Sequence, residues 1–188
     1  MNKTINKFSK GFTLVESLVA IGILSLSIAA TFTAVQSGIK TSIAAKDQIT
    51  AFYLAQEAME YIKNVRDVNA LHSLSGSATS WLTSMSAVAG DPCYFGNTCT
   101  IDSPTLSAGS SFAKCSGSFG TCPNLYQDSV TGLYTQTAGS NPVATNFKRE
   151  IQFTASGADS ILVTIKISWS SEGVAKNFTV TGYVYNRE

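Results

Sequence analysis

Few side chains in this 188-residue sequence are spaced for catalysis. The single histidine, His72, stands beside Leu71 near the end of an expected helix and is interpreted as a surface residue. Ser111 and Lys114 have the spacing of a serine acyl-transfer motif, but the Ser-Asp-Asn and Lys-Thr-Gly strings of that class do not occur in the sequence. A glycine-rich phosphate loop is also missing from the sequence. We therefore expect a protein that is not an enzyme and that uses no cofactor.

The four cysteines all lie between residues 93 and 122, where they could form disulfides or hold zinc. Structural zinc sites generally pair cysteines that are separated by about two to four residues, whereas Cys93 and Cys99, and Cys115 and Cys122, are farther apart. Disulfides and no metal are therefore expected. Four cysteines allow three connectivities, of which we favour the two local ones, Cys93 with Cys99 and Cys115 with Cys122. Such bonds persist in oxidising compartments, so this region is expected outside the cytoplasm.

Glu16 is the only charged residue in the apolar stretch from Phe12 to Val35. As a helix that rises about 1.5 Å per residue, this stretch is long enough to cross a bilayer. An ionised acidic residue costs about 2.5 to 3.5 kcal/mol at the centre of such a helix and less near its end. A charge at this position usually has a function and a partner, although Glu16 could instead reach the cytoplasmic interface.

Residues 1–11 form a basic leader without acidic residues. Its cations are Lys3, Lys7 and Lys10. Basic residues before an apolar span place the start of the chain in the cytoplasm, so we expect everything beyond Val35 to lie outside. The alternative is a secretory signal that is cleaved after the small residues Ala29 and Ala30. The apolar part of such a signal is about 7 to 15 residues long, which is shorter than the stretch found here.

The string Lys10-Gly11-Phe12-Thr13-Leu14-Val15-Glu16 resembles the prepilin processing site of type IV pilins and type II secretion pseudopilins. This resemblance implies cleavage between Gly11 and Phe12 by a prepilin peptidase, followed by N-methylation of the new Phe12 amine. It further implies that Glu16, the fifth residue after the cut, neutralises an α-amino group within the chain or on a neighbour. The implied partners are the prepilin peptidase, other pilin or pseudopilin subunits, an inner-membrane assembly platform and, before assembly, membrane lipid.

Beyond Val35, residues 36–69 lack proline and repeat apolar residues at spacings of three and four. The repeated residues are Ile49, Phe52, Ala55, Met59, Ile62 and Val65. The pattern predicts that the membrane helix of residues 12–35 continues as an amphipathic helix packed on the head, with a coiled coil to another protein as the alternative. The string Leu54-Ala55-Gln56-Glu57 resembles PilV-type minor pilins and, more loosely, GspI-type minor pseudopilins, which implies a minor subunit.

The rest of the chain divides by composition. Residues 70–146 are rich in Ser, Gly, Thr and Asn and are expected to form loops and short strands around the four cysteines. Residues 147–188 alternate apolar and polar side chains in three runs, which predicts three strands of an antiparallel meander. The expected fold class is α+β and pilin-like, with a long N-terminal helix, half of it transmembrane, packed on a small antiparallel sheet.

The charge balance and the motifs together favour a structural role. The 13 basic and 12 acidic residues nearly cancel, which argues against a strongly basic nucleic-acid binder. The leading hypothesis is a minor pilin or minor pseudopilin, anchored by a single span in the inner membrane with an extracytoplasmic head that ends up on a filament. The alternatives are an adhesive or DNA-contacting tip module in residues 70–146 and an anchored protein that never polymerises. The motif does not distinguish a type IV pilus from a type II secretion or DNA-uptake machine.

Overall fold

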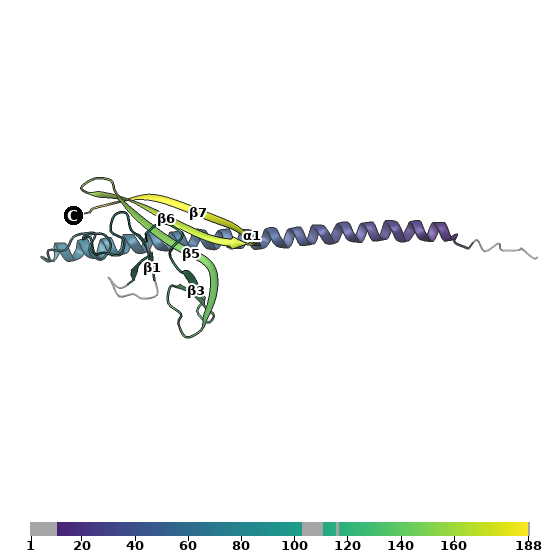
Figure 1. Cartoon of the computed structure of the whole chain (residues 1–188), viewed down its shortest axis with the longest axis horizontal. Helices are drawn as coiled ribbons and strands as arrows, with labels where there is room; N and C mark the ends of the chain where they lie inside the picture. The colour runs from purple at the N-terminus through teal and green to yellow at the C-terminus, as the bar shows by residue number, and fades with distance from the viewer. Residues whose placement is uncertain (1–10, 103–110, 116, 188) are drawn as a thin grey trace, which may run out of the picture. The chain divides into compact units, whose positions relative to one another are not determined.

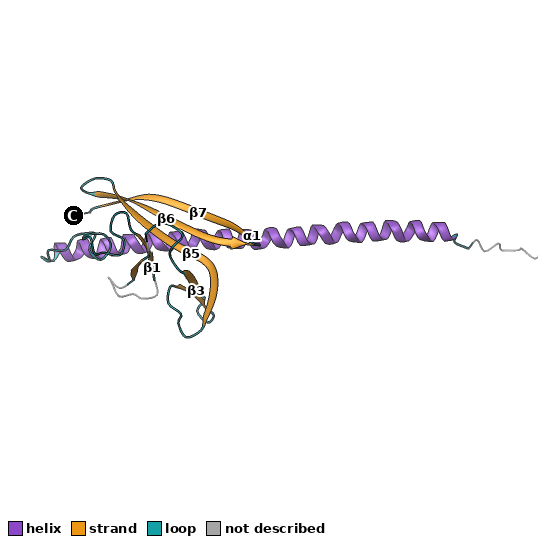
Figure 2. Ribbon diagram, in the orientation of Figure 1, coloured by secondary structure: helices purple, strands orange, loops and turns teal. Residues whose placement is uncertain are grey.

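The computed structural model describes residues 11–102, 111–115 and 117–187 of the chain. One long helix, α1 (Leu14–Leu74), is followed by seven strands that form one antiparallel sheet (Figure 1). Figure 2 shows α1 in purple and the strands in orange, and every described strand follows α1 in the sequence. The predicted α+β class is therefore confirmed. The chain forms two compact units that divide after Ala45, so α1 contributes residues to both.

Helix α1 differs at both ends from the predicted range of residues 12–69. Its C-terminal end lies at Leu74 and is closed by Gly76, whose φ of 91° is readily accessible to glycine. The amide of Gly76 donates to the carbonyl of Ser73 at 3.0 Å, and the amide of Ser77 donates to that of His72 at 3.2 Å. This pair of bonds is a Schellman motif, which satisfies carbonyls that the helix itself leaves without partners.

The last three strands form the predicted meander. Strands β5 (Pro142–Ala155), β6 (Ser160–Ser171) and β7 (Val174–Tyr185) pair antiparallel in sequence order, and β5 begins at Pro142 rather than at Phe147. Glu172 and Gly173 link β6 to β7 with positive φ angles of 52° and 79°. Two consecutive residues of this kind make the turn that best matches the twist of a hairpin.

Four shorter strands lie in residues 70–146, the segment predicted to form loops and short strands. They are β1 (Thr98–Ile101), β2 (Phe112–Lys114), β3 (Asn124–Asp128) and β4 (Tyr134–Thr135). Both β1 and β3 pair with β5, which gives the sheet order β2-β1-β5-β3-β4 with β6 and β7 on the other side of β5. A long strand with an unpaired edge leaves backbone donors and acceptors unsatisfied, and these two short strands pair with that edge.

The hydrophobic core of the head lies between the second half of α1 and the inner face of the sheet. The helix contributes Ala51, Leu54, Ala55, Ala58, Ile62 and Val65, and the sheet contributes residues such as Ile151, Phe153, Val163, Ile165 and Ile167. Two members of the predicted helix stripe are wrongly placed, because Ile49 and Phe52 are 56% and 51% exposed. Instead, Ala51 and Ala58 are fully buried in the core. A Cβ atom added to Gly182 of β7 would lie 3.1 Å from Cε of Met59, so the Met59 side chain packs closely against β7 at this glycine.

A buried arginine ties the helix to the sheet. Arg149 of β5 is fully buried, and its Nη1 lies 2.6 Å from Oε2 of Glu57 on α1. Its Nη2 donates to the carbonyl oxygen of Ile101 on β1 at 2.8 Å. Burial lowers the pKa of Arg149, while the Glu57 carboxylate opposes that shift by favouring the charged form. One side chain therefore joins α1, β5 and β1.

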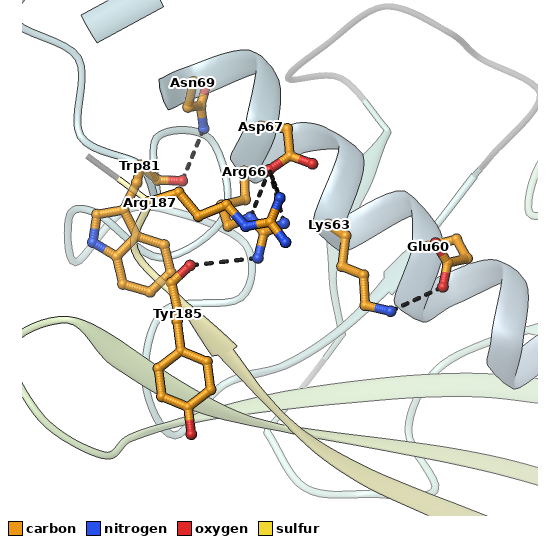
Figure 3. A network of polar contacts seen from close by, with 8 residues as sticks. All are labelled: Glu60, Lys63, Arg66, Asp67, Asn69, Trp81, Tyr185 and Arg187. Atoms are coloured by element: carbon orange, nitrogen blue, oxygen red, sulfur yellow. Dashed lines mark hydrogen bonds and ion pairs between the residues drawn. The ribbon is translucent and has the colours of Figure 1, made fainter. Parts of the chain in front are cut away.

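A second polar network holds the end of β7 and the following residues near the end of α1 (Figure 3). Arg66 lies 2.7 Å from the Asp67 carboxylate and donates to the carbonyl oxygen of Tyr185 at 3.4 Å. The Nδ2 atom of Asn69 donates to the carbonyl oxygens of Trp81 and Thr83 at 3.2 and 3.0 Å. The last turns of the helix thereby fix both the final strand and the loop that leaves the helix.

Disulfides close two local loops of the head. Cys93 is joined to Cys99 and Cys115 to Cys122, and none of the described cysteines is free. Glu150 of β5 supports the second loop, since its Oε1 accepts the amides of Gly120 at 2.6 Å and Cys122 at 3.2 Å. The loop that carries this disulfide is therefore anchored to the central strand of the sheet.

Candidate processing and assembly site

The expected cleavage junction lies at the start of the described chain. Gly11 and Phe12 precede the first helical residue, Leu14, and both are exposed. A Cβ atom built on Gly11 would have no heavy atom within 4 Å. The Gly11–Phe12 peptide bond thus lies in non-helical backbone, and no other part of the described chain crowds Gly11. The remaining leader residues, 1–10, lie outside the described residues.

Thr13 caps the helix immediately after this junction. The amide of Glu16 donates to Oγ1 of Thr13 at 3.3 Å, and the amide of Ser17 donates to the carbonyl oxygen of Thr13 at 3.1 Å. Threonine is among the preferred N-cap residues because its oxygen satisfies an amide that has no partner within the helix. The spacing of Thr13 and Glu16 is that of a capping box, a pattern readable in the sequence that our interpretation of the junction did not use.

Glu16 therefore occupies the first turn of α1. The exposed amides at a helix N-terminus carry about half a positive charge, which favours a carboxylate at this position. A new α-ammonium group on Phe12 would add positive charge next to that end. The first-turn location therefore stabilises the Glu16 carboxylate within its own chain, independently of any pairing with an amine of another chain.

The first half of α1 is apolar on all its faces. Large exposed hydrophobic side chains follow one another along it, among them Leu14, Leu18, Ile21, Leu24, Ile28, Phe32 and Val35. By length and composition α1 is suited to cross a membrane, and within the described residues it is the one helix that is. An exposed apolar surface of this extent is stable in lipid or against other proteins, and not in water.

Several hydroxyl groups in the first half of α1 donate hydrogen bonds to carbonyl oxygens of the preceding turn. Ser27 donates to the carbonyl oxygen of Ile23 at 2.9 Å, and Thr33 donates to that of Ala29 at 2.7 Å. Thr31 and Thr41 make bonds of the same kind to preceding carbonyls. Polar groups that are paired in this way can enter a hydrocarbon layer without leaving an unsatisfied donor.

Comparison with known protein families gave a match at the beginning of the chain. Residues 6–32 match the family model described as the prokaryotic N-terminal methylation motif. The chain carries this methylation motif. The matched range includes Gly11, Phe12 and Glu16, together with much of the apolar helix, and it supports a type IV pilin-like substrate of a prepilin peptidase. No curated protein and no solved structure matched the chain.

The methylation motif and the cysteines belong to different parts of the molecule. Gly11, Phe12 and Glu16 lie in the unit that ends at Ala45, whereas all four cysteines lie in the head. Among the described residues, no group of three or more His, Cys, Asp and Glu side chains is arranged to hold a metal ion. The methylation motif indicates a structural subunit rather than an enzyme.

Proposed function

We propose that the protein is a filament subunit that a prepilin peptidase cleaves between Gly11 and Phe12 and that assembles through α1. The observation that carries the proposal is the methylation motif at residues 6–32, followed by a helix whose first half is exposed and apolar. Cleavage leaves that helix attached to the head. In the membrane the helix is covered by lipid, and in a filament it is covered by the helices of other subunits.

Glu16 is the proposed assembly residue. In the apolar interior of a filament its carboxylate is stabilised by the amino group of Phe12, either on the same chain or on a neighbour, because an unpaired charge there is costly. The first-turn position of Glu16 supports this role, since the carboxylate and the new amine both lie at the same end of α1. N-methylation retains the positive charge of the amine and so preserves the pairing.

The finer assignment is a minor subunit with an extracytoplasmic head. It is supported by the Leu54-Ala55-Gln56-Glu57 string, by the basic leader and by two disulfides in the head. The protein would begin as a single-span inner-membrane protein and end on the surface of a type IV pilus or a type II secretion pseudopilus. Its partners would be the peptidase, the assembly platform and the other subunits.

Replacing Glu16 separates a polymerising subunit from a plain membrane anchor. Glu16→Ala should be cleaved and held in the membrane, yet its amount in sheared filaments should fall at least about tenfold, because the Phe12 amine then loses its carboxylate partner. A tenfold fall corresponds to about 1.4 kcal/mol. Asp159→Ala is the matched control, since Asp159 is an exposed acidic residue of the head in the β5–β6 turn. Equal incorporation of Glu16→Ala and Asp159→Ala would refute the assembly role of Glu16.

A further inference from the structure

A groove runs beside α1 in the head. It has a volume of 490 Å³ and lies between the helix and the residues that lead from β3 into β4. Thr50, Tyr53 and Glu57 line it on the helix side, and Leu133 and Tyr134 line it on the strand side. All of its lining residues belong to the head, so the groove is formed within one compact unit.

The strand side of the groove is held in place before anything binds. The carboxylate of Asp128 accepts the amides of Val130 at 2.9 Å and Thr131 at 2.7 Å, and the amide of Asp128 donates to the carbonyl oxygen of Leu133 at 2.9 Å. Leu133 is nevertheless 53% exposed. A fixed loop therefore presents an apolar side chain to solvent, and a partner that covers it loses little conformational entropy in doing so.

The charged groups that line the groove are two carboxylates, Glu57 and Glu60. Arg149 pairs with Glu57 from beneath and is itself fully buried, and Lys63 pairs with Glu60 at the surface at 2.9 Å. Surface pairs of the second kind contribute little energy and exchange readily. The groove therefore offers aromatic and aliphatic walls with negative charge at one end, which suits an apolar segment that carries a cation.

We propose that the groove holds the α1 segment Ile39–Lys46 of a second copy of the chain in the filament. This inference rests on the proposed function. Ile39, Ile43 and Lys46 are spaced by four and three residues, so they share one face of the helix, and all three are exposed. Between Glu16 and Asp47 the charged residues of α1 are Lys40 and Lys46, both basic. The charge of this segment is thus complementary to that of the groove.

A narrow range of offsets between two parallel helices allows all three contacts. Lys46 faces Glu57 or Glu60 when the second copy is displaced by 11 to 14 residues, from the differences 57 − 46 and 60 − 46. At about 1.5 Å per residue this displacement is roughly 16 to 21 Å along the helix axis. The same offset brings Ile39 level with residues 50–53 and Ile43 level with residues 54–57, which include the groove residues Thr50, Tyr53 and Leu54. A minor subunit makes this contact where two of its copies are neighbours in the filament.

Cysteine crosslinking in assembled filaments tests the contact. Every described cysteine is in a disulfide, so two introduced cysteines would be the reactive pair. Chains with Ile43→Cys and Leu133→Cys should form disulfide-linked dimers of this chain in sheared filaments. The matched control pairs Ile43→Cys with Val130→Cys, an exposed residue of the same loop that does not line the groove. Filaments without dimers, dimers in equal yield from the control, or a bond to a different subunit would overturn the proposal.

Charge reversal gives a second readout that does not depend on new cysteines. Lys46→Glu and Glu60→Lys should each reduce the amount of this chain in filaments by about tenfold, and the double variant should recover most of it. Asp159→Lys, at an exposed acidic residue of the β5–β6 turn, should have no effect. Unaffected single variants, or a double variant no better than either single one, would contradict the groove contact. Failure of the unsubstituted chain to be cleaved or incorporated would instead contradict the proposed function.

Discussion

The amide of Glu16 donates a hydrogen bond to the side chain of Thr13 at 3.3 Å. This bond places the start of α1 immediately after the Gly11–Phe12 junction and fixes Glu16 in the first helical turn. The proposed cleavage site and the proposed assembly residue are therefore linked by local structure as well as by sequence. Cleavage at the proposed site would separate the leader from the helix at the point where regular backbone begins.

Loss of this cap should loosen the beginning of the helix. Replacing an N-cap threonine with alanine costs about 0.5 to 2 kcal/mol, whereas serine retains the accepting oxygen. We expect Thr13→Ala to speed amide hydrogen exchange in the first turn of the mature chain in detergent micelles, relative to Thr13→Ser. Equal exchange in the two variants would show that Thr13 does not cap the helix.

Removal of Arg149 should destabilise the head more than removal of a surface arginine. Breaking a buried ion pair costs about 3 to 5 kcal/mol, and the lower end applies here because the Glu57 side chain is 38% exposed. Urea unfolding of the full chain in detergent, followed by the near-ultraviolet signal of the buried Trp81 and Trp169, measures this loss for Arg149→Ala. Arg187→Ala, at a side chain that is 68% exposed, should change the free energy of unfolding by less than about 0.5 kcal/mol. Similar values for both variants would contradict the anchoring role of Arg149.

Removal of the second disulfide should free the loop that Glu150 supports. The double variant Cys115→Ser, Cys122→Ser should lose roughly 2 to 3 kcal/mol of stability and become more sensitive to trypsin after Lys114. Thr121→Ala changes a residue of the same loop and leaves the Cys115–Cys122 disulfide intact. Its cleavage rate should therefore match that of the unsubstituted chain. Unchanged cleavage in the cysteine variant would show that the hydrogen bonds to Glu150 hold the loop without the disulfide.

Alkaline pH should weaken the head through Tyr134. Burial raises the pKa of this phenol, the bond to Thr50 opposes that shift, and the negative charge of Asp47 adds to it. A raised folded-state pKa stabilises the fold at pH values below the unfolded pKa of about 10, and that contribution is lost as the pH rises through the folded value. Tyr134→Phe should therefore show a shallower fall in unfolding free energy above about pH 10 than the unsubstituted chain. Parallel curves for the two proteins would contradict this assignment.

The sequence was most informative where local patterns decide the structure. The apolar run and the junction at Gly11 predicted the helix and the methylation motif, and period-two alternation predicted β5, β6 and β7. The short strands β1 to β4 were not located individually, because two to five residues hold too little periodic signal and their pairing depends on the distant β5. The burial of Ala51 rather than Phe52 also depends on the sheet, since apolar residues occur on several faces of the helix and packing against the sheet selects among them.

The groove could not be predicted from the sequence either, because it is formed by residues that are far apart in the chain. Tyr53 and Leu133 are far apart in the chain and become neighbours through the packing of β3 and β4 against β5 and α1. Arg149 is likewise unremarkable in the sequence, where a lone arginine in a strand is typically exposed. Its burial against Glu57 follows from the alternation of side chains along β5 once the strand is placed.

The most direct test of the central claim is the N-terminus of the mature protein, determined by intact mass and N-terminal sequencing with and without the prepilin peptidase. The account predicts peptidase-dependent loss of residues 1–11 and a methylated Phe12, abolished by Gly11→Val but not by Gly22→Val, a matched glycine within the apolar helix that no neighbouring atom contacts. A full-length chain in the presence of the peptidase, or a chain cut near Ala30, would contradict it.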